Sequence, residues 1–148
     1  MQAKVGEAEV LPGDDVLVAY PLLKAKLPRL RELAKTLRVL TTVVSTAVPG
    51  QCVIDAGSKT LSSDQTVGAG TFGHFVGRGR GRGRPWTMRK LNEEHGYVEI
   101  DEPVRVGEKV WVVPSHCCAT VNLHDEIWYG RRGRVEGSWQ VAARGKVR

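Results

Sequence analysis

Apolar residues recur along this chain with two different spacings. Within residues 22–37 they follow steps of three and four, which predicts an amphipathic helix with a Lys/Arg-rich outer face. The leucines of this stripe are Leu23, Leu27, Leu30, Leu33 and Leu37. The run DDVLVAYP (14–21) just before it predicts a short buried strand. A single β-α unit cannot bury both of its faces, so residues 1–38 are expected to be a fragment of a larger fold.

From Val39 onward the pattern is that of short strands separated by turns. The run VLTTVVSTAVPGQCVIDAG (39–57) supplies β-branched residues broken by Pro49-Gly50, and YGRRGRV (129–135) predicts a hairpin turn. Further strands are predicted at 97–101, 108–114, 119–123, 126–130 and 134–145. Several strands at this spacing are typical of an antiparallel barrel or sandwich, which we expect over residues 39–148. The Gly-rich segment 66–90 is predicted to be a loop.

Composition bounds the class of protein without identifying it. The chain of 148 residues is 41% apolar, enough to bury a core. It has neither an apolar run of about 18 residues nor a signal-peptide pattern, so a cytoplasmic protein without a membrane span is expected. The three cysteines are odd in number, and two of them are adjacent, which argues against a disulfide framework.

The basic excess comes mainly from one loop. Four arginines stand in GRGRGRGRP, and without them the net charge would be +2 rather than +6. They are Arg78, Arg80, Arg82 and Arg84. Such alternation is also found in RNA-binding segments, but a short charge run is most often solvated, which is the expectation here.

One cluster of side chains can carry chemistry. His116, Cys117 and Cys118 stand side by side in PSHCCATVNL. If this stretch is a strand, residues 116 and 118 share a face and can reach one metal ion while Cys117 points away. Two ligands do not complete a site, and a buried cysteine is often only a small apolar residue, so both interpretations stay open on spacing alone.

Five phrases in order resemble the D-threonine aldolase and D-serine dehydratase family of alanine-racemase-like, pyridoxal-phosphate (PLP) enzymes. They are AKVGEAEVL (3–11), DDVLVAYPL (14–22), VIDAGSKTLSSDQ (53–65), LNEEHGYVEID (91–101) and VVPSHCCATVNLHDEIW (112–128). The resemblance implies a mainly β protein: a β-α remnant of a (β/α)8 barrel at 1–38, then the family's C-terminal antiparallel β-domain at 39–148. The family's cofactor lysine lies in a segment R-P-H-x-K-T-H, which this sequence does not contain. A truncated member, inactive alone and not binding PLP, is therefore expected.

The resemblance also assigns a site. It implies that His116 and Cys118 hold a divalent metal, zinc or else manganese, with Cys117 a bystander, and that His95 lies at the site edge. Imidazole with thiolate favours zinc. The substrate implied is a D-β-hydroxy amino acid, and the expected partners are a second copy of the chain or an intact homologue. A separate metal-binding or dimerising β-domain is the alternative function.

The remaining candidates are expected to be structural. Lys59 in DAGSK is not the family's cofactor lysine, and its neighbours Asp55, Gly57 and Ser58 are expected to shape a turn. His124 and Asp125 are expected to be exposed polar residues, and Lys4 to pair with Glu7 or Glu9. Core or dimer-interface roles are expected for Trp111, Trp128 and Trp139.

Overall fold

The computed structural model describes residues 37–66, 68–76, 86–131 and 134–146. The predicted β-α unit of residues 14–37 lies, except for its last residue, outside the described residues. The same holds for Lys4 and for the four arginines of the Gly-Arg loop.

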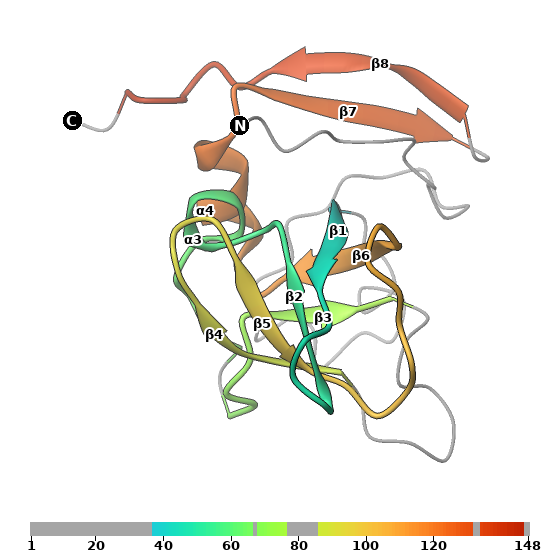
Figure 1. The fold of residues 1–148 in the computed structure, drawn as a ribbon. Helices are drawn as coiled ribbons and strands as arrows, with labels where there is room; N and C mark the ends of the chain where they lie inside the picture. The colour runs from blue at the N-terminus through green and yellow to red at the C-terminus, as the bar shows by residue number, and fades with distance from the viewer. Residues whose placement is uncertain (1–36, 67, 77–85, 132–133, 147–148) are drawn as a thin grey trace, which may run out of the picture.

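Six strands form one antiparallel sheet that curls into a nearly closed barrel (Figure 1). They are β1 (Val39–Ser45), β2 (Gln51–Ile54), β3 (Gly73–Phe75), β4 (Thr87–Leu91), β5 (Gly96–Glu99) and β6 (Lys109–Pro114). Their order in the sheet is β3-β6-β1-β2-β5-β4. The two edges approach each other, since the Phe72 amide donates to the Met88 carbonyl at 3.3 Å. The prediction of a mainly β, antiparallel barrel is confirmed.

The barrel interior is filled by the alternate residues of each strand. In β2 the side chains of Cys52 and Ile54 are fully buried, whereas their neighbours are half-buried. The core cluster consists of Val39, Val43, Cys52, Ile54, Ala56, Leu61, Phe75, Trp86, Met88, Val98, Val110 and Val112. Burial of this apolar area is the main favourable term in folding, and all six strands contribute side chains to it.

Two strands lie in the segment that was predicted to be a loop. β3 and all but the last residue of β4 fall within residues 66–90, so that prediction is wrong. β3 is only three residues long and carries one large apolar side chain, Phe75, which packs against Trp86 with ring centroids 5.4 Å apart. A strand this short, set among glycines, has no alternation that a sequence pattern can detect.

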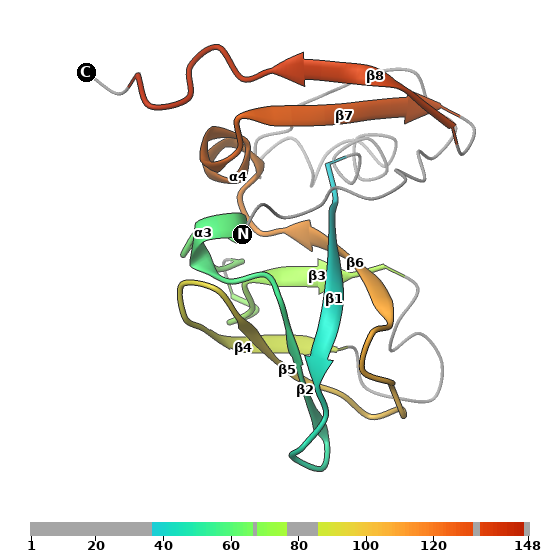
Figure 2. The ribbon, with the colours of Figure 1, turned by 45° about the horizontal axis from the view of Figure 1, so that its top comes forward.

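Two short helices, α3 (Ser58–Leu61) and α4 (Cys117–Leu123), lie together at one end of the barrel (Figure 2). The strand predicted at 119–123 is therefore wrong. Buried Thr120 explains the difference: its hydroxyl lies 2.9 Å from the carbonyl oxygens of both Leu61 and His116. A β-branched residue that favours a strand is here held in a helix by contacts from another segment.

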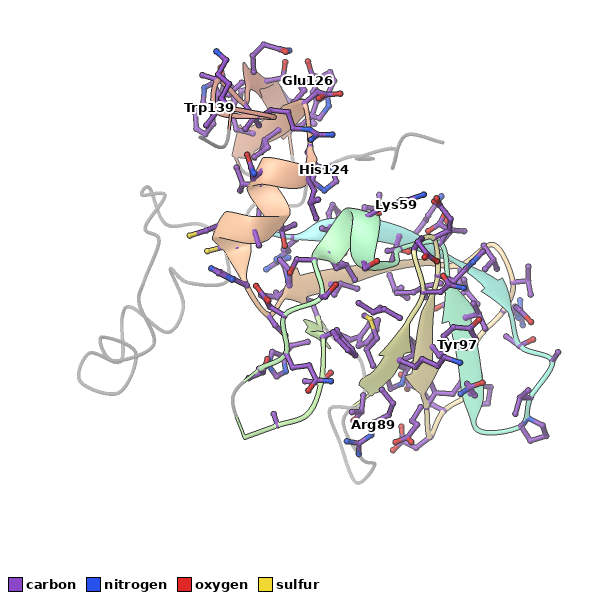
Figure 3. All side chains as sticks on the ribbon, turned by 90° about the vertical axis from the view of Figure 1, so that its left-hand side faces the viewer. Lys59, Arg89, Tyr97, His124, Glu126 and Trp139 are labelled. Carbon is purple, nitrogen blue, oxygen red and sulfur yellow. The ribbon has the colours of Figure 1, made fainter. Side chains whose placement is uncertain are left out.

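The chain ends in a hairpin of β7 (Glu126–Arg131) and β8 (Arg134–Gln140), which α4 connects to the barrel. The hairpin was predicted and stands away from the barrel (Figure 3). Trp128 is 42% and Trp139 51% exposed, so neither belongs to the core, while Tyr129 stacks on Trp139 at 4.5 Å. Trp111 lies half-buried in β6. In the part of the chain described, no helix is long and apolar enough to cross a membrane.

Candidate metal centre

His116 and Cys118 lie where β6 passes into α4, and not within a strand. His116 is the N-cap residue of α4 with extended backbone angles (φ −135°, ψ 99°), and Cys118 is the second helical residue. The expectation that both side chains point to one face of a strand is therefore wrong. Both side chains are nevertheless exposed at the same end of the helix, whereas Cys117 is half-buried.

The His116 imidazole is held by a carboxylate from a distant segment. Its Nδ1 lies 2.5 Å from Oδ2 of Asp64, which stands 52 positions earlier in the loop after α3. Both side chains are about half exposed, at 51% and 52%. Sequence reasoning missed Asp64, although it lies in the phrase VIDAGSKTLSSDQ, because nothing in the sequence pairs it with residue 116.

A chain of polar side chains fixes the loop that carries Asp64. Thr66 Oγ1 lies 2.8 Å from Ser115 Oγ and 3.3 Å from His74 Nε2. The Ser115 hydroxyl donates to the Thr71 carbonyl at 2.9 Å. The residue before His116 is therefore bonded to the residue two positions after Asp64, so the two segments meet in a defined arrangement.

The two adjacent cysteines differ in their surroundings. Burial and then the neighbouring Cys118 raise the pKa of the Cys117 thiol, which keeps it protonated at neutral pH. Thiolate is the form that binds metals. The environment of Cys117 therefore fits the bystander that the resemblance implies.

The donor set at the start of α4 suits a soft or borderline ion with open coordination positions. One imidazole and one thiol are ligands that zinc accepts and that harder ions such as manganese do not prefer. Among the described residues, no three His, Cys, Asp or Glu side chains converge to hold an ion. The residues thus fit a metal bound by two side chains of this part of the chain, with its other ligands coming from elsewhere.

The segment NEEHG forms the tight turn between β4 and β5. The Asn92 side chain accepts hydrogen bonds from the amides of Glu94 at 3.0 Å and His95 at 2.6 Å. The backbone carbonyls of Asn92 and Glu93 accept from the first amides of α3. His95 is thus part of a turn that supports α3, and its role at a site edge stays a prediction.

Lys59 lies exposed on α3 (Figure 3). Its ammonium group pairs with the Glu94 carboxylate at 2.7 Å. The hydrogen bond and the charge of Glu94 raise the pKa of Lys59, so the amine stays protonated. A protonated amine is not a nucleophile. The exposed position of Lys59 also differs from the desolvated pocket that activates a Schiff-base lysine.

Asp55 ties the end of β2 to β1. Burial alone would raise the pKa of its carboxyl, but hydrogen bonds from the Thr41 hydroxyl (2.5 Å) and the Thr42 amide (2.7 Å) hold it below its usual value. Asp55 is followed in the sequence by Ala56 and Gly57, where the chain turns into α3. The expectation that this stretch shapes a turn agrees with these contacts.

His124 and Asp125 follow α4 rather than a strand. The His124 Nε2 lies 3.0 Å from the Thr60 carbonyl, which joins the end of α4 to α3. Asp125 is exposed and pairs with Arg144 at 3.2 Å. His124 therefore joins α4 to α3, and Asp125 holds the segment after β8. Only Asp125 is the exposed polar residue that was predicted.

The fold is a small β-domain, a barrel with two short helices at one end. Its candidate metal centre is the histidine and the cysteine exposed at the start of α4. The profile of the family described as a putative serine dehydratase domain matches residues 36–129. The chain belongs to this family.

Relatives of two kinds share this domain. A 3-hydroxy-D-aspartate aldolase of Paracoccus denitrificans is 41% identical over 118 residues, which are 78% of this chain and 27% of that enzyme. An uncharacterized protein of Mycobacterium tuberculosis is 37% identical over 97 residues, which are 64% of this chain and 69% of that protein. The crystal structure of a D-threonine aldolase from Filomicrobium marinum superposes with a TM-score of 0.62 at 31% identity, covering 76% of this chain and 29% of that one. The chain thus spans about 27% of the length of the aldolase it matches in sequence.

Proposed function

We propose that this chain is the metal-bearing β-domain of a PLP- and divalent-metal-dependent lyase that acts on D-β-hydroxy amino acids. The observation that carries the proposal is the pair of His116 and Cys118, exposed at the start of α4 within the matched family domain. The names of the aldolase relatives support the substrate class, a D-amino acid with a hydroxyl on its β-carbon.

In this proposal the ligands from this chain are His116 Nε2 and the Cys118 thiolate. A divalent ion bound there would act as a Lewis acid toward the substrate β-hydroxyl. That polarisation serves an aldolase, which removes the hydroxyl proton as the Cα–Cβ bond breaks to give glycine and an aldehyde. It also serves a dehydratase, in which the hydroxyl leaves and a 2-oxo acid and ammonia result.

The protein's own contribution is to orient this ion and to keep it accessible. His116 is fixed by Asp64, and the loop of Asp64 is fixed by Thr66 and Ser115. Both side chains are exposed at the start of α4, so an ion that they held would be accessible to a substrate. PLP supplies the electron sink for the carbanion, and its lysine is expected in the R-P-H-x-K-T-H segment of the family's barrel.

At equilibrium with a small excess of zinc, the purified 148-residue chain is expected to bind about one ion per chain. EDTA should remove the ion, and manganese offered at the same concentration should bind more weakly, because imidazole and thiolate prefer the softer metal. Elemental analysis after equilibrium dialysis measures both. A chain that retains no zinc after incubation with a small excess would overturn the metal function.

The chain by itself is expected to show no lyase turnover of D-threonine or 3-hydroxy-D-aspartate. The reason is that Lys59, the lysine whose surrounding sequence DAGSK most resembles a Schiff-base motif, is exposed and paired with Glu94. Borohydride reduction in the presence of PLP should add no cofactor mass at Lys59, as read by peptide mass spectrometry. Turnover by the isolated chain, or stoichiometric labelling of Lys59, contradicts this expectation.

The length of one relative favours a second candidate function. The matched 97 residues make up 69% of the Mycobacterium tuberculosis protein, so a chain of similar size carries the same domain. Such a chain would be a metal-binding or dimerising domain that pairs with a second copy or with an intact homologue. The two candidates differ in one result: supplying a family barrel domain in trans restores lyase turnover only if this domain contributes to a lyase site.

A further inference from the structure

We propose that Asp64 is the positioning residue for His116: it holds the imidazole by Nδ1, so that Nε2 is the nitrogen presented to the metal. This inference rests on the proposed metal role of His116. Neither the sequence pattern nor the names of the relatives assign a role to Asp64.

The direction of the hydrogen bond follows from the chemistry of the two groups. A carboxylate only accepts hydrogen bonds, so at the 2.5 Å contact Nδ1 must be the donor and carry the proton. The neutral ring then has its lone pair on Nε2. Metal-ligating histidines commonly donate their second ring nitrogen to a carboxylate in this way, which fixes both the tautomer and the ring orientation.

The position of Asp64 is set by the fold, and not by this contact alone. The Asp64 amide donates to the Ser62 hydroxyl oxygen at 3.3 Å, and Leu61 is joined to α4 through buried Thr120. On the other side Thr66 is bonded to Ser115. An exposed ion pair is worth little when two long side chains must be ordered, whereas Asp64 and His116 have short side chains on segments that the Thr66–Ser115 bond holds together.

The proposal gives Asp64 a role different from that of a third ligand. In the described part of the chain no three potential ligands converge, although Asp64, His116 and Cys118 all belong to that part. The Asp64 oxygen lies against the proton-bearing nitrogen of His116, the one opposite to the metal-facing atom. Its effect on the metal therefore passes through the imidazole.

The first test reads the tautomer of His116 in the metal-free full chain by ¹⁵N NMR. Wild type is expected to show Nδ1 protonated and Nε2 unprotonated. Asp64→Ala removes the acceptor and should move the population toward the Nε2-protonated form that an unconstrained imidazole prefers. An unchanged tautomer in Asp64→Ala overturns the proposal, whether or not the chain binds zinc.

The second test measures zinc affinity by competition with a chromogenic chelator. Asp64→Ala is expected to weaken zinc binding by about 10- to 100-fold. Asp64→Asn keeps an oxygen acceptor for Nδ1–H and should lose less than Asp64→Ala. Asp101→Ala, which removes the same charge from an exposed residue in the loop after β5, is the matched control and should bind zinc like wild type.

The outcomes separate the two proposals. Equal affinities of Asp64→Ala and Asp101→Ala overturn the positioning role while the metal function stands. Absence of zinc binding in wild type overturns the metal function, and the tautomer of His116 then decides whether Asp64 orients the ring.

Discussion

Replacing Gly57 by alanine is expected to destabilise the domain by about 3 kcal/mol, the upper end of the usual cost of overpacking. A Cβ at this position would lie 2.4 Å from the Asn92 carbonyl oxygen and 2.5 Å from that of Glu93. Both atoms belong to the backbone, so no side-chain rotation relieves the overlap. The turn between β4 and β5 would have to move away from α3.

That movement would break the support of α3. The Asn92 carbonyl accepts from the Ser58 amide at 2.8 Å, and the Glu93 carbonyl accepts from the Lys59 amide at 3.1 Å. These are the first amides of the helix, which otherwise have no intrahelical partner. Urea unfolding followed by tryptophan fluorescence measures the loss as a lower midpoint at unchanged slope.

Gly107→Ala is the matched control. Gly107 has a φ of +91°, but nothing lies within 4 Å of an added Cβ, so the substitution costs only backbone strain, about 1–2 kcal/mol. At Gly57 the backbone conformation (φ −106°) is permitted for alanine, but there is no space for the added Cβ. A Gly57→Ala protein no less stable than Gly107→Ala would show that the contact between the NEEHG turn and α3 does not matter for the fold.

The sequence pattern was sufficient for strands that alternate and insufficient for elements that depend on distant contacts. β2, β5 and β6 were predicted because their inward residues are apolar and regularly spaced. β3 is too short to show such a pattern, and α4 contains Thr120 and Val121, residues that favour strands. Within this helix Thr120 bonds both to the His116 carbonyl and to the end of α3, and the second contact spans 59 positions that no local pattern can show.

The same limit applies to the candidate site. The resemblance supplied His116 and Cys118, but the reasoning that placed them on one face of a strand was wrong, because the strand ends at Pro114. Asp64 could not be predicted at all, since its contact with His116 depends on how α3 and α4 pack. Ligand identity can follow from local sequence, whereas the orientation of a ligand is a property of the tertiary structure.

Cys118→Ser is expected to weaken zinc binding by more than about 100-fold, while Cys117→Ser should leave it nearly unchanged. Loss of an outer-shell partner already costs about 10- to 100-fold, and removal of a direct ligand should cost more. His116→Ala should match Cys118→Ser for the same reason. Competition with a chromogenic chelator measures all three variants under one condition.

The adjacent cysteines make this a test of position and not only of chemistry. Both variants lose one thiol from the same turn of α4, so an ion held non-specifically by any nearby sulfur would be weakened about equally by each. Cobalt substitution gives an independent readout, because a thiolate ligand produces an intense charge-transfer absorption that Cys118→Ser should abolish and Cys117→Ser should keep. If the band follows Cys117 instead, the half-buried thiol is the ligand, and the assignment of Cys118 is overturned.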